Sequence, residues 1–371
     1  MIKKKIAINA SNLHSGGGVQ VAASFISDIL TNHELTKDIL KSYSITIFIS
    51  DKVGKCLQKK IEFFDGISII KKNSYGIRSI FSNTLTFKSF DKVFTIFGPL
   101  YIFHKRYDHI CGFAQPWIAF PESKFIKSLT LHEKFLKKLK LSLQKLFFFK
   151  FSDVLVVETD AVRSCLIKNY NFNNIYVVPN SLNSFFYGLN DKKITKSYDD
   201  TINVCYVSRG YPHKNHLFII KLAEFLKKNA LNHSRSFRFH ITLSDQELRN
   251  LNISCVESVI NHGEIELKQL PKFYNAMDAS IFPSKLECFS AFPIESMHFM
   301  NHLFVSDEPF NKYLPEDSVT FIDTNNVEET ANKILIHDYN DSRGLIQSKK
   351  FVQSLPTSID RTKNYLDIVM D

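Results

Sequence analysis

The chain has 371 residues, which is enough for two domains of ordinary size. Hydrophobic residues make up 44% and charged residues 23%, the proportions of a globular protein, so each half can bury a core. The formal net charge of +10 leaves three kinds of partner open: nucleic acid, an anionic membrane surface or a phosphate-bearing substrate.

The cysteines and the N-terminus indicate the compartment. The 6 cysteines are scattered without a CxxC pair, which favours free thiols in a reducing cytoplasm over a zinc site or a disulfide framework. Residues 1–9 carry charge and no long apolar run follows them, so we expect a first strand here and not a signal peptide. No window reaches the roughly 18 uninterrupted apolar residues that a membrane span requires. We therefore expect a cytoplasmic protein.

The first half of the chain alternates strands and helices. An apolar strand at 5–9 precedes a run of three glycines, and helical periodicity follows at 19–30. Further strands are predicted at 44–50, 93–97, 109–113, 154–158 and 175–178, with helical segments between several of them. This order predicts an open α/β domain with a mostly parallel sheet.

The second half repeats the alternation. Residues 183–201 are polar and are interpreted as a linker between a first domain at 1–182 and a second at 202–355. Strands are predicted at 202–207, 237–243, 256–262, 279–282 and 302–305, and helices at 217–228, at 267–276, after Glu287 and at 356–371.

Two glutamates follow the strand that ends at Phe282. Pro293 suits the first turn of a helix, so Glu287 should lie in the preceding loop and Glu295 in the helix. Backbone N–H groups near 289–291 would point out of the helix start toward an anion. The two carboxylates could hold a sugar and a ribose, with a diphosphate between them; alternatively, they are surface glutamates that flank a helix start.

Basic residues follow another strand of the second half. Arg209 and Lys214 come after the strand that ends at Val207, at the carboxyl end of a parallel sheet, where such folds bind ligands. Arginine offers a bidentate fork and lysine a movable charge, which suits a diphosphate; the alternative is a solvated basic loop. Residues 16–18 are glycines that permit close backbone approach, but they match neither the dinucleotide fingerprint nor a phosphate-binding Walker loop.

Together these motifs resemble glycosyltransferase family 4, over nearly the whole chain. The glycines at 16–18 resemble its acceptor-side loop, and Val178-Pro-Asn180 resembles the turn that ends its first domain. Arg209 and Lys214 fall on its Arg-x4-Lys, and Glu287 and Glu295 on its Glu-x7-Glu. Cys288 and Ser290 depart from the pattern, because the family usually has glycine there. The resemblance implies the GT-B fold, in which two Rossmann-like domains face each other across a cleft and the final helix crosses back to the first domain.

The resemblance also implies an activity and the residues that perform it. It implies retaining transfer of a sugar from a nucleotide-sugar to a hydroxyl of a glycan acceptor, with a lipid-linked acceptor in bacterial O-antigen, lipopolysaccharide or capsule synthesis. Its catalytic residues would be Arg209, Lys214 and Glu287. Its donor contacts would be Gly17, Gly18, Ser208, Cys288, Phe289, Ser290, Ala291 and Glu295. Its acceptor side would include Gly16, His109, Gln115 and Trp117.

No cofactor or metal is expected, because the chain has no Asp-x-Asp pair, and Arg209, Lys214 and helix-start amides would neutralise the diphosphate. The family often has a histidine near the acceptor, and either His109 or Gln115 could take that place. His109 could equally be a structural histidine. Trp117 could stack on a sugar or belong to the core.

Lysines interleave with Leu and Phe over residues 124–150 at near-helical spacing. This pattern fits an ordinary surface helix or a helix that docks on an anionic membrane surface, such as the inner face of the cytoplasmic membrane. Nucleic acid is not expected, because no known nucleic-acid-binding motif is present. Two other classes of function stay open: a sugar-nucleotide epimerase or phosphorylase on the same fold, and a non-catalytic protein that binds a membrane surface or nucleic acid.

Overall fold

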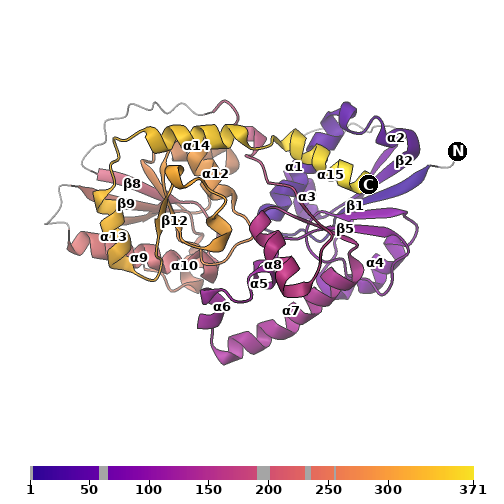
Figure 1. The fold of residues 1–371 in the computed structure, drawn as a ribbon, viewed down its shortest axis with the longest axis horizontal. Helices are drawn as coiled ribbons and strands as arrows, with labels where there is room; N and C mark the ends of the chain where they lie inside the picture. The colour runs from indigo at the N-terminus through magenta and orange to yellow at the C-terminus, as the bar shows by residue number, and fades with distance from the viewer. Residues whose placement is uncertain (1–2, 58–65, 190–200, 230–234, 255) are drawn as a thin grey trace. The chain divides into compact units, whose positions relative to one another are not determined.

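The computed structural model describes residues 3–57, 66–189, 201–229, 235–254 and 256–371 (Figure 1). The chain divides into two compact units. Unit 1 comprises Met1–Glu122, Ser128–Ser181 and Pro356–Asp371, and unit 2 comprises Ser123–Lys127 and Leu182–Leu355. Most of the predicted linker at 183–201 lies outside the described residues.

Unit 1 is built on a seven-stranded sheet in the order β3-β2-β1-β4-β5-β6-β7. Every neighbouring pair of its strands is parallel. The strands are β1 (Lys4–Ala10), β2 (Tyr43–Ile49), β3 (Ile67–Lys71), β4 (Lys92–Thr95), β5 (Asp108–Gly112), β6 (Val154–Val157) and β7 (Ile175–Val177). The strand order reverses between β1 and β4, which is the position where open α/β sheets bind ligands.

Side chains alternate between the two faces of this sheet and create two layers of core. Ile6 and Ile8 of β1 face one cluster, and Ala7 between them faces the other. The first cluster includes residues of α1 (Gly17–Thr31), α3 (Asp51–Cys56) and α15 (Ser358–Met370). The second includes residues of α4 (Ile80–Phe87) and α7 (Leu131–Phe151). The remaining helices of residues 1–181 are α2 (Ile39–Ser42), α5 (Pro116–Ala119), α6 (Lys124–Ser128) and α8 (Asp160–Tyr170).

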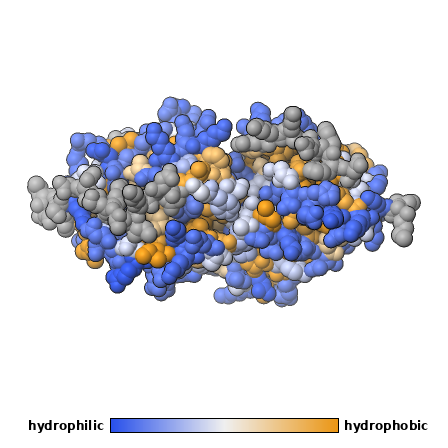
Figure 2. Space-filling view, turned by 90° about the horizontal axis from the view of Figure 1, so that it is seen from above, coloured by the Kyte–Doolittle hydropathy of each residue, from blue (hydrophilic) through white to orange (hydrophobic). Residues whose placement is uncertain are grey.

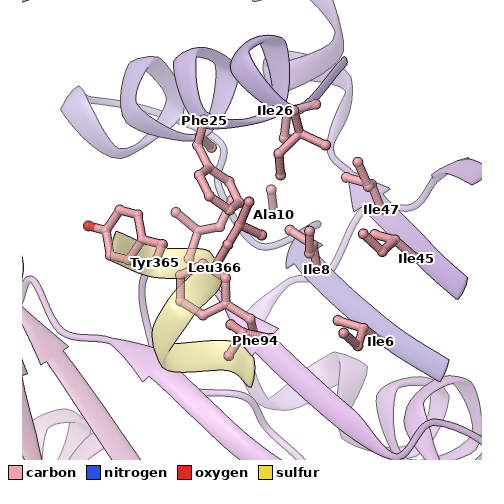
Figure 3. Packing of buried hydrophobic residues seen from close by; sticks show 14 of the residues in the cluster. Ile6, Ile8, Ala10, Phe25, Ile26, Ile45, Ile47, Phe94, Tyr365 and Leu366 are labelled. Carbon is pink, nitrogen blue, oxygen red and sulfur yellow. The ribbon is translucent and has the colours of Figure 1, made fainter. Parts of the chain in front are cut away.

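The C-terminal helix α15 belongs to unit 1. Tyr365 and Leu366 point into the cluster around Phe25 of α1 and Phe94 of β4 (Figure 3). Burying a side chain of this size stabilises the fold by about 1.5–3 kcal/mol. Arg361 adds a polar anchor, because its guanidinium donates to Asn180 Oδ1 at 2.6 Å. Apolar burial and this bond together hold the end of the chain on unit 1.

Unit 2 has the same plan with six strands, in the order β10-β9-β8-β11-β12-β13, all parallel. The strands are β8 (Thr201–Tyr206), β9 (Ser236–Ile241), β10 (Val259–Asn261), β11 (Ala279–Phe282), β12 (His302–Ser306) and β13 (Thr320–Ile322). The helices are α9 (His216–Lys228), α10 (Asp245–Asn250), α11 (Leu270–Asn275), α12 (Ala291–His298), α13 (Val327–Ile336) and α14 (Arg343–Ser354). The strand order reverses between β8 and β11.

The prediction of two α/β domains with parallel sheets is therefore confirmed. On the face drawn in Figure 2, hydrophilic residues predominate and hydrophobic ones occur in small, scattered groups. Among the helices of the described ranges, none combines the length and apolar character needed to span a bilayer.

Candidate active site

The candidate site lies at the point where the strand order of unit 2 reverses. One of its loops follows β8 and carries Arg209 and Lys214, and the other follows β11 and carries Glu287. Because β8 and β11 are parallel neighbours, both loops leave the same edge of the sheet. As predicted, Glu287 lies in the loop and Glu295 in the helix that follows, with Pro293 in the first turn of that helix.

Lys214 and Glu287 form an ion pair between the two loops. Lys214 Nζ lies 2.5 Å from Glu287 Oε1, and the side chains are only 14% and 9% exposed. Ser284 donates its hydroxyl to the same carboxylate oxygen at 2.6 Å. Breaking such a pair by removing one partner is costly, because the other charge stays largely shielded from water. The pair therefore defines a rigid polar centre.

The backbone holds this pair in place. The Lys285 N–H donates to the carbonyl of His213 at 2.8 Å, and the Asn215 amide donates to the carbonyl of Pro283 at 3.2 Å. Asn215 has φ 62°, a left-handed conformation that asparagine tolerates better than most residues. The two loops are thus cross-linked beside the ion pair.

Arg209 extends from the same loop into a cluster of carboxylates. Its Nε lies 3.0 Å from Glu247 Oε1, and its Nη1 forms an ion pair with Glu264. The arginine side chain is 54% exposed, whereas that of Glu247 is 13% exposed. Arg209 is therefore held at its inner end and remains open to solvent at its outer end.

Glu247 is a residue of this cluster that sequence reasoning missed. Its Oε1 accepts the N–H of Gly210 at 2.8 Å, and its Oε2 accepts the N–H and the hydroxyl of Ser244 at 3.0 and 2.9 Å. Burial alone would raise the pKa of Glu247, but these hydrogen bonds and the charge of Arg209 lower it. A Cβ added at Gly210 would lie 2.7 Å from the Cβ of Glu247, so only glycine fits this close approach. The capping-box pattern Ser244-x-x-Glu247 was the available sequence signal for a helix start.

The start of α12 forms another wall of the site. Cys288 is buried, Phe289 and Ser290 are half-buried, and Ala291 is exposed. Ser290 is the N-cap residue, and its side chain makes no capping hydrogen bond. The first N–H groups of the helix, together with its dipole, suit an anion.

Glu295 lies within α12 and is set apart from Glu287. Tyr274 donates its hydroxyl to Glu295 Oε2 at 2.8 Å. Burial raises the pKa of Glu295, and this hydrogen bond offsets part of the rise. The two glutamates therefore occupy different environments: one neutralises a lysine, and the other is held by a phenol.

Ser208 is fixed by a buried histidine. Its Oγ lies 3.2 Å from Nε2 of His216, the first residue of α9. Burial, followed by the charge of Lys214, lowers the pKa of His216 to about 3. The ring is therefore neutral at physiological pH and serves as a structural support.

The residues predicted for the acceptor side all lie in unit 1. The glycines at 16–18 follow β1 and open α1, and Gly16 has φ 74°. Gln115 donates to Gln144 at 3.1 Å, and Lys137 Nζ lies 3.5 Å from the centre of the Trp117 ring.

His109, predicted as a possible acceptor contact, is enclosed within unit 1. It is fully buried in β5, with Nε2 3.0 Å from Thr95 Oγ1 and Nδ1 2.9 Å from the carbonyl of Phe151. Burial lowers its pKa to about 4. It is a core histidine, as the alternative interpretation held. Within the described part of the chain, His, Cys, Asp and Glu form no group of three or more that could hold a metal ion.

Comparisons with known proteins identify a family model that matches part of the chain. Residues 189–348 match the family model of the group 1 glycosyl transferases. A search of curated proteins finds no significant match. The matched segment spans the candidate site of unit 2.

Solved structures share the fold of the whole chain. HepE from Anabaena, in complex with UDP and glucose, is similar over 99% of both chains, with a TM-score of 0.63 and 12% identity. A glycosyltransferase from Rickettsia africae is similar over 99% of this chain and 98% of that chain, with a TM-score of 0.63 and 16% identity. WaaG, a glycosyltransferase involved in lipopolysaccharide biosynthesis, is similar over 98% of this chain and 99% of that chain, with a TM-score of 0.65 and 11% identity. The chain therefore has the GT-B fold, with two Rossmann-like units.

Proposed function

We propose that this protein is a retaining glycosyltransferase that moves a sugar from a nucleotide-sugar to a hydroxyl of a glycan acceptor. The observation that carries the proposal is the Lys214–Glu287 pair, which lies where the strand order reverses in the unit that matches the group 1 glycosyl transferases. A cation beside a carboxylate suits a ligand that combines an anionic diphosphate with sugar hydroxyls.

Arg209 and Lys214 are proposed to bind the diphosphate of the donor. Positive charge at the leaving group stabilises the transition state, commonly by a few kcal/mol. Because Arg209 is half exposed, its outer end can exchange Glu264 for a phosphate while Glu247 keeps hold of its inner end. No metal or other cofactor is proposed.

Glu287 and Glu295 are proposed to hold the two sugars of the donor. Glu287 would accept hydrogen bonds from hydroxyls of the transferred sugar, and Glu295 would bind the ribose. The start of α12 supports this arrangement, because its free N–H groups suit the phosphates between them. On the family resemblance, further donor contacts are proposed at Gly17, Gly18, Ser208 and residues 288–291, and acceptor contacts at Gly16, Gln115 and Trp117.

The proposed reaction exchanges one glycosidic bond for another on the same face of the sugar. The bond from the anomeric carbon to the diphosphate oxygen breaks as a bond to the acceptor oxygen forms. The departing diphosphate oxygen takes the acceptor proton, so the reaction needs no separate protein base. The ion-paired environment of Glu287 agrees with an orienting role, because it already neutralises Lys214.

A lipid-linked glycan is the proposed acceptor, with a bacterial O-antigen, lipopolysaccharide or capsule unit as the product. The family resemblance supports this, as does the fold similarity to WaaG, which is involved in lipopolysaccharide biosynthesis. The complex of HepE with UDP-glucose makes a uridine nucleotide the first donor to test.

Helix α7 supports peripheral attachment to the inner face of the cytoplasmic membrane. Exposed apolar side chains recur every four residues along the N-terminal half of this helix. They are Leu131 (86% exposed), Phe135 (71%) and Leu139 (76%). Lys138 and Lys140 are exposed beside them. Lysines near an anionic bilayer contribute about 1 kcal/mol each. The C-terminal half of α7 packs in the core through Phe147 and Phe151, which leaves the N-terminal half for the proposed docking.

The test is a thermal-shift screen of nucleoside diphosphates and their sugars, followed by mass spectrometry of the products. The proposal predicts stabilisation by one nucleotide series and sugar transfer with retained configuration. An epimerised nucleotide-sugar as the only product would instead indicate an epimerase. A complete lack of nucleotide affinity, with salt-sensitive binding to vesicles or nucleic acid, would indicate a non-catalytic binding protein.

A further inference from the structure

A second polar centre joins the loops after β1 and β3 in unit 1. The strand order there reverses between β1 and β4, and the loop after β1 carries His14. The loop after β3 carries Ser74 and Tyr75 and leads into a 3-10 helix at Gly76–Ser79. Because these strands are parallel members of one sheet, both loops leave the same edge of it.

Buried hydroxyl and amide groups fix these loops to each other. The Ser74 N–H donates to the carbonyl of Ser11 at 2.9 Å, and the two hydroxyl oxygens lie 2.9 Å apart. The Ser74 hydroxyl in turn donates to Asn83 Oδ1 at 2.9 Å, and the Ser11 N–H donates to Asn9 Oδ1 at 3.1 Å. All four residues are buried. Such a connected network holds its members in one arrangement.

This network positions His14. Its Nε2 lies 2.8 Å from the carbonyl oxygen of Ser74, which can only accept, so Nε2 carries the proton that is donated. The ring is half-buried, and this hydrogen bond fixes its position at the edge of the sheet.

Tyr75 covers His14. The two rings are stacked, with their centres 4.4 Å apart and their planes 11° from parallel. The Tyr75 N–H donates to Ser79 Oγ at 2.7 Å, which fixes the backbone of the tyrosine. Tyr75 is nevertheless 59% exposed. A rigid aromatic ring with one face supported and the rest open to solvent is a suitable wall for a ligand with an apolar face.

We infer that His14 and Tyr75 form a binding subsite for one pyranose ring of the acceptor. The apolar C–H face of the sugar would stack on the exposed face of Tyr75, and His14 would support the opposite face of that ring. This inference rests on the proposed function, because it assigns one substrate of the transfer to unit 1. Neither residue was singled out from the sequence, because the stacked pair joins loops 61 positions apart.

The subsite is tested by saturation-transfer difference NMR on the full-length protein. The probes are methyl α-D-glucopyranoside, methyl α-D-galactopyranoside and methyl α-D-mannopyranoside. The wild type should saturate the ring protons of at least one of them. Y75A should weaken that binding by about threefold to tenfold, the range expected for loss of one stacking contact. H14A, which removes the ring that supports Tyr75, should also weaken it.

Y176A is the matched control, because Tyr176 is a 40% exposed tyrosine on strand β7 of the same unit. It should bind the probes like the wild type. Equal binding by Y75A and the wild type would overturn the subsite, and so would the absence of any probe signal with the wild type. Nucleotide binding is measured on the same samples. If the wild type binds no nucleotide, the proposed function is contradicted. If the wild type binds a nucleotide but Y75A binds the sugar probes as the wild type does, only the subsite is contradicted.

Discussion

Replacing Glu287 by glutamine distinguishes two roles of the Lys214–Glu287 ion pair: its contribution to stability and its proposed role in catalysis. Glutamine keeps the shape and one acceptor oxygen but removes the negative charge 2.5 Å from Lys214 Nζ. Removing one partner of a fully buried pair costs about 3–5 kcal/mol. Because both side chains keep a little exposure, we expect E287Q to lower the free energy of unfolding by about 3 kcal/mol.

The double variant K214M/E287Q is the matched control. It removes both charges, so it should regain most of that stability while sugar transfer stays strongly reduced. Urea unfolding followed by far-UV circular dichroism measures the effect. Fluorescence is unsuitable, because the only tryptophan, Trp117, lies in unit 1 and does not report on unit 2.

Ligand binding adds an independent check on E287Q. Its unpaired Lys214 should still accept a nucleoside diphosphate, since the phosphate charge replaces the lost carboxylate. Transfer of sugar should nevertheless fall by more than about a hundredfold, in line with loss of about 3 kcal/mol of transition-state stabilisation. If E287Q unfolds like the wild type and transfers sugar at the same rate, then the pair is neither buried nor functional in the way described.

Three further predictions concern other parts of the chain. Glu247→Ala should raise the donor KM about tenfold, and should cost about 1–2 kcal/mol of stability through loss of the α10 cap; an unchanged KM would exclude Glu247 from positioning Arg209. Burial, followed by the charges of His262 and Arg238, lowers the pKa of His240 to about 4; the unfolded chain therefore binds more protons between about pH 6.5 and 4, and stability should fall as the pH falls through that window. Urea midpoints measure this, and H240Q should flatten part of the slope, whereas an equal slope in both proteins would contradict it. Phe135→Ser should weaken co-sedimentation with phosphatidylglycerol vesicles without affecting transfer to a soluble acceptor, and equal vesicle binding would remove α7 from the proposed docking surface.

The fold could be predicted well because its signals are local. Most long strands are largely apolar runs such as 202–207, and several of them are followed by a polar loop and a periodic helix. The edge strands β3 and β13 were missed, because they are short and only partly buried, so their sequences lack a continuous apolar run. The predicted strand at 256–262 is shorter in the structure, where β10 spans Val259–Asn261.

The candidate site could be predicted only where its residues lie in recognisable motifs. Arg209, Lys214 and Glu287 follow strand ends, so their common edge of the sheet could be inferred. The contact of Arg209 with Glu247 could not be inferred, because it joins the loop after β8 to helix α10 and depends on how closely the backbone approaches at position 210. The role of His109 was ambiguous for a related reason. Periodicity indicates a strand, but it does not show which polar side chains of that strand form hydrogen bonds in the interior of the domain.

The central claim is that the β8 and β11 loops of unit 2 bind the diphosphate of a nucleotide-sugar through Lys214. Titration calorimetry of UDP, GDP, ADP, CDP and dTDP into the wild type and K214M tests it most directly. The account predicts that one of these nucleotides binds the wild type, and that K214M binds it at least about tenfold more weakly, the effect of one lost charge-assisted contact. Equal affinity for the two proteins, or no binding of any of the five nucleotides to the wild type, would contradict it.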